Sequence, residues 1–215
     1  RQAIKDFLYR QQLKAIGDNH ESWMFRPYVL NATENESNST IEVPAVLWTP
    51  PLYDPTGDPA SNYGALGMLV SHEFMHAFGN VNRVWLDAQD ESTFTAKTHR
   101  LVQQADAYTM TTPDGEVRHL DGTNTLEENL ADLDGVRVAY DAFLHADTAN
   151  TNASHSVFTP AQRFFLAFAN LMREKEVREH VNDTHAPKKF RVNGPLSNMP
   201  EFAQAFGCKD GDPMV

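Results

Sequence analysis

The sequence predicts a mainly α-helical domain with a small antiparallel sheet, an α+β fold. Apolar residues recur with helical spacing in several segments, whereas only residues 41–48 have the composition of a strand. Capping residues, glycines and prolines bound most helical segments, so the sequence itself marks the breaks. At 215 residues and 41% hydrophobic content, the chain can form one sizeable domain or the larger part of a two-lobed one.

Six helices are expected in chain order. They span residues 2–16, 63–79, 93–109, 124–146, 159–179 and 199–206. The fifth opens with Thr159-Pro160, a cap followed by proline at the first helical position. The strand at 41–48 is expected at a sheet edge, because Pro44 has no N–H to donate to a ladder. Residues 183–198 are expected to form a loop.

Charge and hydropathy exclude two classes of partner. Eighteen Lys and Arg residues against 29 Asp and Glu give a net charge of -11. Nucleic-acid binding requires a basic face, and the sequence has none, so a nucleic-acid partner is excluded; a mild preference for cationic peptides is consistent with the acidity. No apolar run approaches the ~18 residues of a membrane helix. Membrane attachment is therefore expected only through an anchor outside this chain.

Cysteine and sequon content bear on the compartment. The single cysteine, Cys208, cannot form a disulfide within the chain, and a buried thiol is the simplest interpretation. Five Asn-x-Ser/Thr sequons exceed the number that chance supplies; they lie at Asn31, Asn35, Asn38, Asn152 and Asn182. The sequons favour a glycosylated protein that is extracellular, either secreted or the ectodomain of a membrane-anchored protein.

The run His72-Glu73-Phe74-Met75-His76 carries the strongest chemical signal. Residues four apart on a helix share a face, so the two histidines can bind one metal ion. Glu73 lies about 100° round the helix from His72, where its carboxylate can reach a water at the metal without being a ligand. Two imidazoles beside a general base are typical of zinc peptidases.

A catalytic zinc needs a third protein ligand, and two patterns compete to supply it. His72 to Gly79 matches the first part of the metzincin signature, which requires a ligand three residues after the glycine. Asn82 occupies that position and is a poor zinc ligand. The alternative is a glutamate on a second helix, as in thermolysin-like enzymes.

The segment Glu127-Glu128-Asn129-Leu130-Ala131-Asp132 offers such a glutamate. Glu128 and Asp132 are four apart, so Glu128 can bind the metal while Asp132 accepts the second N–H of a ligand histidine. Glu127 also has a purely structural explanation, because solvated acidic residues are favoured in the first turn of a helix. This explanation suits Asp132 less well, because apolar residues surround that position.

Longer stretches then resemble the C-terminal catalytic part of the neprilysin and endothelin-converting-enzyme family of zinc endopeptidases. The matching stretches run in family order: 31–32, 44–45, 50–51, 61–76, 120–126, 128–132, 164–169, 185–187, 190–192 and 196–198. The resemblance implies a thermolysin-like zincin catalytic domain over residues 1–215. It also implies that the N-terminal helical lobe of the family is not in this chain.

The resemblance assigns the catalytic roles. His72, His76 and Glu128 correspond to the ligands of one Zn²⁺ ion, and Glu73 to the general base. Asp132 corresponds to the carboxylate behind a ligand histidine. The implied reaction is hydrolysis of short peptides on the amino side of hydrophobic residues.

Further residues are assigned by the same resemblance to the substrate. His185 corresponds to a histidine that hydrogen-bonds the developing oxyanion, and Arg191 to an arginine that binds the substrate carbonyl. Asn31 and Ala32 correspond to the pair that holds the substrate backbone extended. The apolar specificity pocket corresponds to Leu47, Leu52, Met68 and Leu69.

The chain departs from the family pattern at several points. Gly79-Asn80 replaces acidic residues after the metal helix, and Glu127 replaces a glycine before the ligand glutamate. These changes leave an alternative open, a catalytically impaired zinc-binding relative that acts as a peptide-binding or structural domain. Cys208 lies where the family has a cysteine that pairs far upstream, which implies a possible link to the N-terminal lobe.

Overall fold

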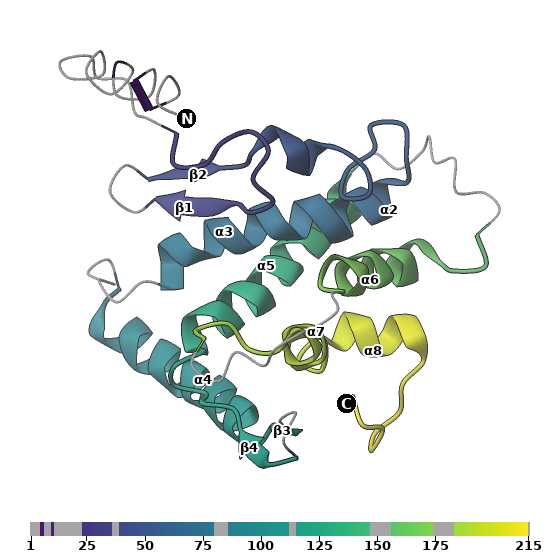
Figure 1. The fold of residues 1–215 in the computed structure, drawn as a ribbon. Helices are drawn as coiled ribbons and strands as arrows, with labels where there is room; N and C mark the ends of the chain where they lie inside the picture. Colours follow the sequence, from purple (N-terminus) through teal and green to yellow (C-terminus); the bar gives the residue numbers. More distant parts are fainter. Residues whose placement is uncertain are drawn as a thin grey trace.

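The computed structural model describes residues 5–6, 10, 23–35, 39–79, 86–111, 115–146, 156–173 and 183–214. Its elements are β1 (Thr33–Asn35), β2 (Thr40–Glu42), η1 (Ala45–Trp48), α2 (Pro59–Asn62), η2 (Tyr63–Gly67), α3 (Met68–Gly79), α4 (Ala88–Asp106), β3 (Thr109–Thr111), β4 (Val117–His119), α5 (Leu126–His145), α6 (Pro160–Leu171), α7 (Lys188–Leu196) and α8 (Pro200–Phe206). The predicted mainly helical fold with little sheet is confirmed (Figure 1).

Several sequence features lie outside the described residues. They are almost all of the helix expected over 2–16, together with Asn82 and the sequon residues Asn38, Asn152 and Asn182. The other predicted helices are present with shifted ends. Helix α4 begins earlier than expected because the carboxylate of Asp87 accepts the backbone N–H groups of Gln89 and Asp90, each at 2.8 Å. The helix expected over 159–179 has its cap at Thr159 as predicted but ends at Leu171.

The sheet prediction needs two corrections. The strand expected over 41–48 ends at Glu42, and residues 45–48 form the 3₁₀ turn η1 after Pro44. Among the described residues, the expected single sheet is instead two antiparallel hairpins, β1 with β2 and β3 with β4. Thr33 pairs with Glu42 in the first hairpin, and Thr109 pairs with His119 in the second.

The prediction of a loop over residues 183–198 is also wrong, because Lys188–Leu196 forms the helix α7. Gly194 and Pro195 in its last turn lower its helix propensity. Burial of Phe190 and Leu196 stabilises the helix nevertheless. Tertiary packing therefore overrides the local preference here.

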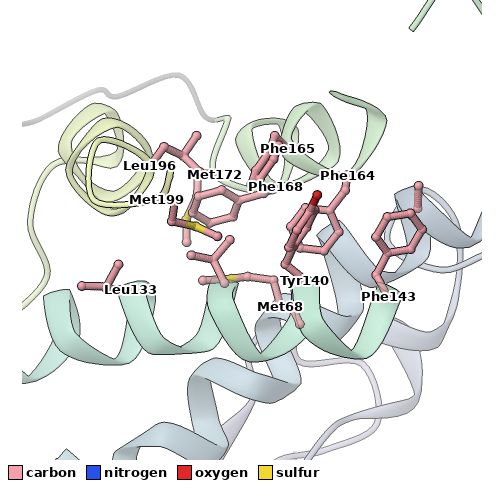
Figure 2. Close-up of a cluster of buried hydrophobic side chains, with 13 residues drawn as sticks. Met68, Leu133, Tyr140, Phe143, Phe164, Phe165, Phe168, Met172, Leu196 and Met199 are labelled. Atoms are coloured by element: carbon pink, nitrogen blue, oxygen red, sulfur yellow. The ribbon is translucent and has the colours of Figure 1, made fainter. Parts of the chain in front are cut away.

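The core lies between α5 and the helices on either side of it. Figure 2 shows side chains of α3, α5, α6 and the C-terminal region meeting in one cluster. Its fully buried members include Met68 of α3, Val136 of α5 and three phenylalanines of α6: Phe164, Phe165 and Phe168. Burying side chains of this size contributes about 1.5–3 kcal/mol each. The core thus fixes α5 as the central helix.

Two glycines allow close helix contacts. A Cβ on Gly135 of α5 would lie 2.9 Å from both the Cα and the backbone nitrogen of His72 in α3. A Cβ on Gly64 of η2 would lie 2.2 Å from the carbonyl oxygen of Phe164 in α6. No side chain fits in either place, so both contacts depend on glycine.

A partly buried ion pair joins α2 to α6. The Arg163 guanidinium donates to Asp58 with an Nε–Oδ2 distance of 2.8 Å and an Nη2–Oδ1 distance of 3.1 Å. Asp58 also accepts the hydroxyl of Ser61 at 3.0 Å. Burial raises the pKa of Asp58, but Arg163 and Ser61 outweigh it and hold the pKa below its ordinary value of 3.8.

Within the described part of the chain, no helix combines the length and the apolar character needed to cross a bilayer.

Replacing Gly135 with alanine should destabilise the protein. The new Cβ meets backbone atoms of α3, which cannot move aside cheaply, so we expect a loss of about 1–3 kcal/mol in the free energy of unfolding by urea titration. Gly79→Ala is the matched control, since its Cβ would meet only Leu130 Cδ2 at 3.8 Å, and its stability should be unchanged or higher. Equal stability of Gly135→Ala and the wild type would contradict this packing.

Asp58→Asn should weaken the protein in a pH-dependent way. Because the folded-state pKa is lowered, the carboxylate stabilises the fold above the unfolded-state value of 3.8 and loses this effect as the pH falls through the folded-state value. We expect a loss of about 1–2 kcal/mol in urea titrations at pH 7, and a loss that becomes smaller as the pH falls below 3.8. Asp210→Asn, an exposed carboxylate, is the control. A pH-independent loss would argue against the ion pair.

Candidate active site

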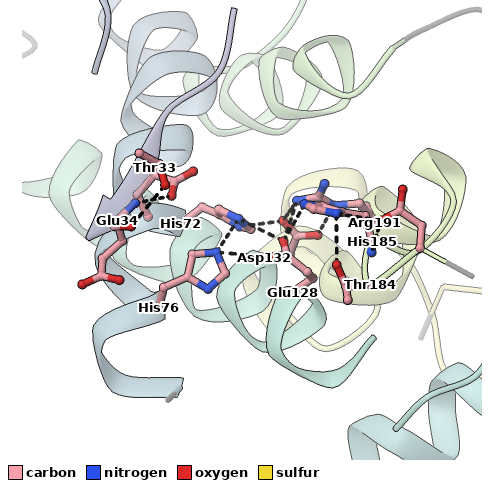
Figure 3. Close-up of polar contacts among 11 residues, drawn as sticks. Thr33, Glu34, His72, His76, Glu128, Asp132, Thr184, His185 and Arg191 are labelled. Carbon is pink, nitrogen blue, oxygen red and sulfur yellow. Dashed lines mark hydrogen bonds and ion pairs between the residues drawn. The ribbon is translucent and has the colours of Figure 1, made fainter. Parts of the chain in front are cut away.

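Two histidines of α3 and one glutamate of α5 converge on a single point. Nε2 of His72 lies 3.2 Å from Nε2 of His76 and 3.3 Å from Oε2 of Glu128. Nε2 of His76 lies 3.7 Å from Oε1 of Glu128. Figure 3 shows the two imidazoles and the carboxylate facing one another. The spacing of the histidines on one helix face, expected from the sequence, accounts for the first contact.

This group has the size of a metal site. Its three donor atoms lie within 4.8 Å of one another. A tetrahedral zinc ion with bonds of about 2.0–2.1 Å has ligand–ligand edges of roughly 3.3 Å, close to the three measured separations. Two imidazole nitrogens and one carboxylate are also the donor set of many catalytic zinc sites, which leave the fourth position to water.

The charges around this point also favour a cation. The carboxylates of Glu73, Glu128 and Asp132 gather here against one guanidinium, that of Arg191. Oε2 of Glu128 is buried without a well-aligned hydrogen bond. Burial raises the pKa of Glu128, but His185 and His72 outweigh it and hold the pKa far below its ordinary value. A dication at this point would meet a buried carboxylate oxygen that has no hydrogen-bond partner in the described part of the chain.

Asp132 lies behind the metal-facing group with no exposed surface. Its Oδ1 is 2.9 Å from Nδ1 of His72, off the ideal hydrogen-bonding direction, so the contact is chiefly electrostatic. Arg191 of α7 donates to both of its oxygens, with Nε–Oδ2 at 2.7 Å and Nη2–Oδ1 at 2.8 Å. Burial lowers the pKa of His72, but Asp132 and Glu128 outweigh it and raise the pKa to about 9.

Glu73 points into the same pocket and is held by β1. The backbone N–H of Glu34 donates to Oε2 of Glu73 at 3.0 Å. Burial raises the pKa of Glu73 above its ordinary value, and the nearby His72 offsets only part of that rise. A carboxylate with a raised pKa beside a metal-facing group has the proton affinity that a general base needs.

His185 closes the other side of the group. Its Nε2 lies 3.1 Å from Oε2 of Glu128, and its Nδ1 lies 3.0 Å from Oδ1 of Asp183. Asp183 also accepts the backbone N–H of His185 at 3.0 Å, so one carboxylate fixes both the loop and the ring. The close contact with the Glu128 carboxylate is the main cause that raises the pKa of His185.

A pocket of about 540 Å³ joins these groups to the residues expected to bind substrate. Every residue expected from the sequence lines it except Asp132, which lies behind the wall; the others are Asn31, Ala32, Leu47, Leu52, Met68, Leu69, His72, Glu73, His76, Glu128, His185 and Arg191. Asn31 is both an expected substrate-binding residue and the first residue of a sequon, and it is exposed at the edge of the pocket.

Sequence reasoning missed several residues of the site. Leu171 and Met172, at the end of α6, extend the apolar wall of the pocket. Asp183 holds His185, and its position two residues earlier was the available signal. Gly135, an isolated glycine within a helical pattern, marks the close approach of α5 to His72.

Comparison with known proteins agrees with this geometry. The profile described as peptidase family M13 matches residues 31–215. An endothelin-converting enzyme homologue of Locusta migratoria is 35% identical over 91% of this chain and 29% of its own length; human endothelin-converting enzyme 1 is 33% identical over 91% and 27%. The zinc metalloprotease ZMP1 of Mycobacterium tuberculosis, solved with an inhibitor, superposes with a TM-score of 0.82 at 30% identity, over 92% of this chain and 32% of that one.

These matches extend over nearly the whole chain, although the chain spans only about a third of the length of the relatives it matches. The profile match takes in all of the residues that line the pocket except Leu30. The expected family resemblance is therefore confirmed, and the chain belongs to peptidase family M13.

Proposed function

We propose that this chain forms the catalytic part of a zinc endopeptidase that hydrolyses short peptides. The observation that carries the proposal is the metal-sized group of His72, His76 and Glu128 with Glu73 beside it in one pocket. Two zinc-type imidazoles adjacent to a carboxylate of raised pKa suit hydrolysis better than simple metal storage. Relatives named as endothelin-converting enzymes, neprilysins and zinc metalloproteases support the same class.

In the proposed mechanism, His72, His76 and Glu128 hold one zinc ion. The ion, when bound, supplies a Lewis acid that lowers the pKa of a water and polarises a carbonyl. Glu73 accepts the proton of the attacking water, and the hydrogen bond from the Glu34 backbone keeps its carboxylate aimed into the pocket. Asp132 fixes the orientation of the His72 ring.

His185 and Arg191 are proposed to stabilise the oxyanion that forms at the scissile carbonyl. Asp183 holds the His185 ring, and Asp132 holds the Arg191 guanidinium, so both donors are positioned before substrate binds. Preorganised donors of this kind contribute about 10²–10³ each to the rate. The Asp183 carboxylate beside Nδ1 favours the protonated ring, which is the stronger donor.

The pocket also indicates how a peptide lies. Asn31 and Ala32, next to β1, offer backbone and amide groups to an extended peptide. Six apolar side chains then line one end of the pocket: Leu47, Leu52, Met68, Leu69, Leu171 and Met172. We propose that they receive the hydrophobic residue that follows the scissile bond.

The setting of the catalytic part remains a proposal as well. We propose an extracellular location, secreted or anchored outside this chain, and an N-terminal lobe supplied by the rest of the protein. Cys208 is half-buried and is the available residue for a covalent link to that lobe. An impaired, purely peptide-binding relative is the alternative, and no feature of the site favours it.

Two variants separate catalysis from metal binding. Glu73→Gln should retain one equivalent of zinc and lose about 10²–10⁴ in kcat on a quenched oligopeptide, because the base is removed and the ligands remain. Glu128→Ala should lose zinc affinity by more than about 100-fold in a chelator competition, since even outer partners of a metal site cost 10–100-fold. Wild-type cleavage by Glu73→Gln, or wild-type zinc affinity of Glu128→Ala, would contradict the proposal.

A further inference from the structure

Glu127 is an acidic side chain of the pocket that the proposed mechanism does not use. It is the second residue of α5 and is exposed, and it lines the same pocket as its neighbour Glu128. No hydrogen bond or ion pair joins its carboxylate to another residue in the described part of the chain. An unpaired charge facing a substrate pocket is available to a charged ligand.

The position of Glu127 is opposite the apolar end of the pocket. Along α3, Met68 and Leu69 line the pocket at the first turn, and Gly79 lines it at the last. A Cβ on Gly79 would lie 3.8 Å from Cδ2 of Leu130, the fifth residue of α5, so the start of α5 lies near the last turn of α3. The pocket therefore has an apolar end, a central metal-facing group and an acidic end formed by Glu127.

We propose that Glu127 selects peptides that have a lysine or arginine at either of the two positions before the scissile bond. The inference rests on the proposed function, in which the apolar end holds the hydrophobic residue after that bond. A peptide extended across the central group then places its preceding residues at the acidic end. A basic side chain there meets the free carboxylate of Glu127.

Other charges of the pocket do not neutralise this one. Arg191 is paired with Asp132, and no ion pair is seen between Glu127 and Lys188, the first residue of α7, in the described part of the chain. The net charge of -11 adds a long-range attraction for cationic peptides but selects no position in them. Only a charge that lines the pocket distinguishes a lysine before the bond from a lysine elsewhere.

A helix-start role without a ligand is the competing explanation, because acidic residues in the first turn stabilise a helix. Glu201 provides the matched control. It is also the second residue of its helix, α8, and is exposed, but it does not line the pocket. Both glutamates should affect stability alike, and only Glu127 should affect peptide preference.

The test uses quenched peptides identical except for Lys, Gln or Glu two positions before the scissile bond. The zinc-loaded wild type should prefer Lys over Gln in kcat/KM by about two- to fivefold at low salt, and the ratio should fall toward one at high salt. In Glu127→Gln the Lys-to-Gln ratio of kcat/KM should fall to about one. Glu127→Lys should prefer the Glu peptide, whereas Glu201→Gln should keep the wild-type ratio.

A binding measurement keeps this inference distinct from the peptidase proposal. In a Glu73→Gln background, fluorescence anisotropy gives dissociation constants for the same peptides without cleavage. A Lys preference that Glu127→Gln removes supports the inference even if the wild type cuts no peptide. Equal Lys-to-Gln ratios for the wild type, Glu127→Gln and Glu127→Lys would overturn it, even if every peptide is cut.

Discussion

The site depends on one fully buried carboxylate, that of Asp132. Taking an isolated charge out of water costs several kcal/mol, so the carboxylate requires partners on both sides. Arg191 satisfies both of its oxygens, and His72 lies against one of them. These contacts join α5, α7 and α3 at a single point. The orientation of His72, and so the geometry of the metal-facing group, follows from this junction (Figure 3).

Close packing of α3 on α5 makes the junction possible. Gly135 lets the two backbones approach until its hydrogen faces the backbone of His72. Glu128 lies about two turns earlier on the same helix and so reaches the point where His72 and His76 converge. The apolar core behind, centred on Met68, Val136 and Phe168, holds this spacing. Core and site are thus parts of one packing arrangement.

The features that the sequence predicted correctly depend on residues close together in the chain. His72 and His76 share a helix face by spacing alone, and Thr159-Pro160 marked the start of α6 correctly. The i, i+4 spacing to Asp132 already favoured Glu128 as the third ligand. A role for His185 needed the family resemblance, because it depends on contacts between segments far apart in sequence. Helix α7 was missed for the same reason: its Gly194 and Pro195 disfavour a helix, and burial with the Asp132 contact compensates.

Anomalous diffraction at the zinc absorption edge, from crystals of the zinc-loaded protein, tests the central claim most directly. The claim is that His72, His76 and Glu128 form one three-ligand zinc site organised by Asp132. We predict a single strong peak about 2.0–2.2 Å from Nε2 of His72, Nε2 of His76 and an oxygen of Glu128. A peak bound by other residues, or none at full zinc loading, would contradict the account.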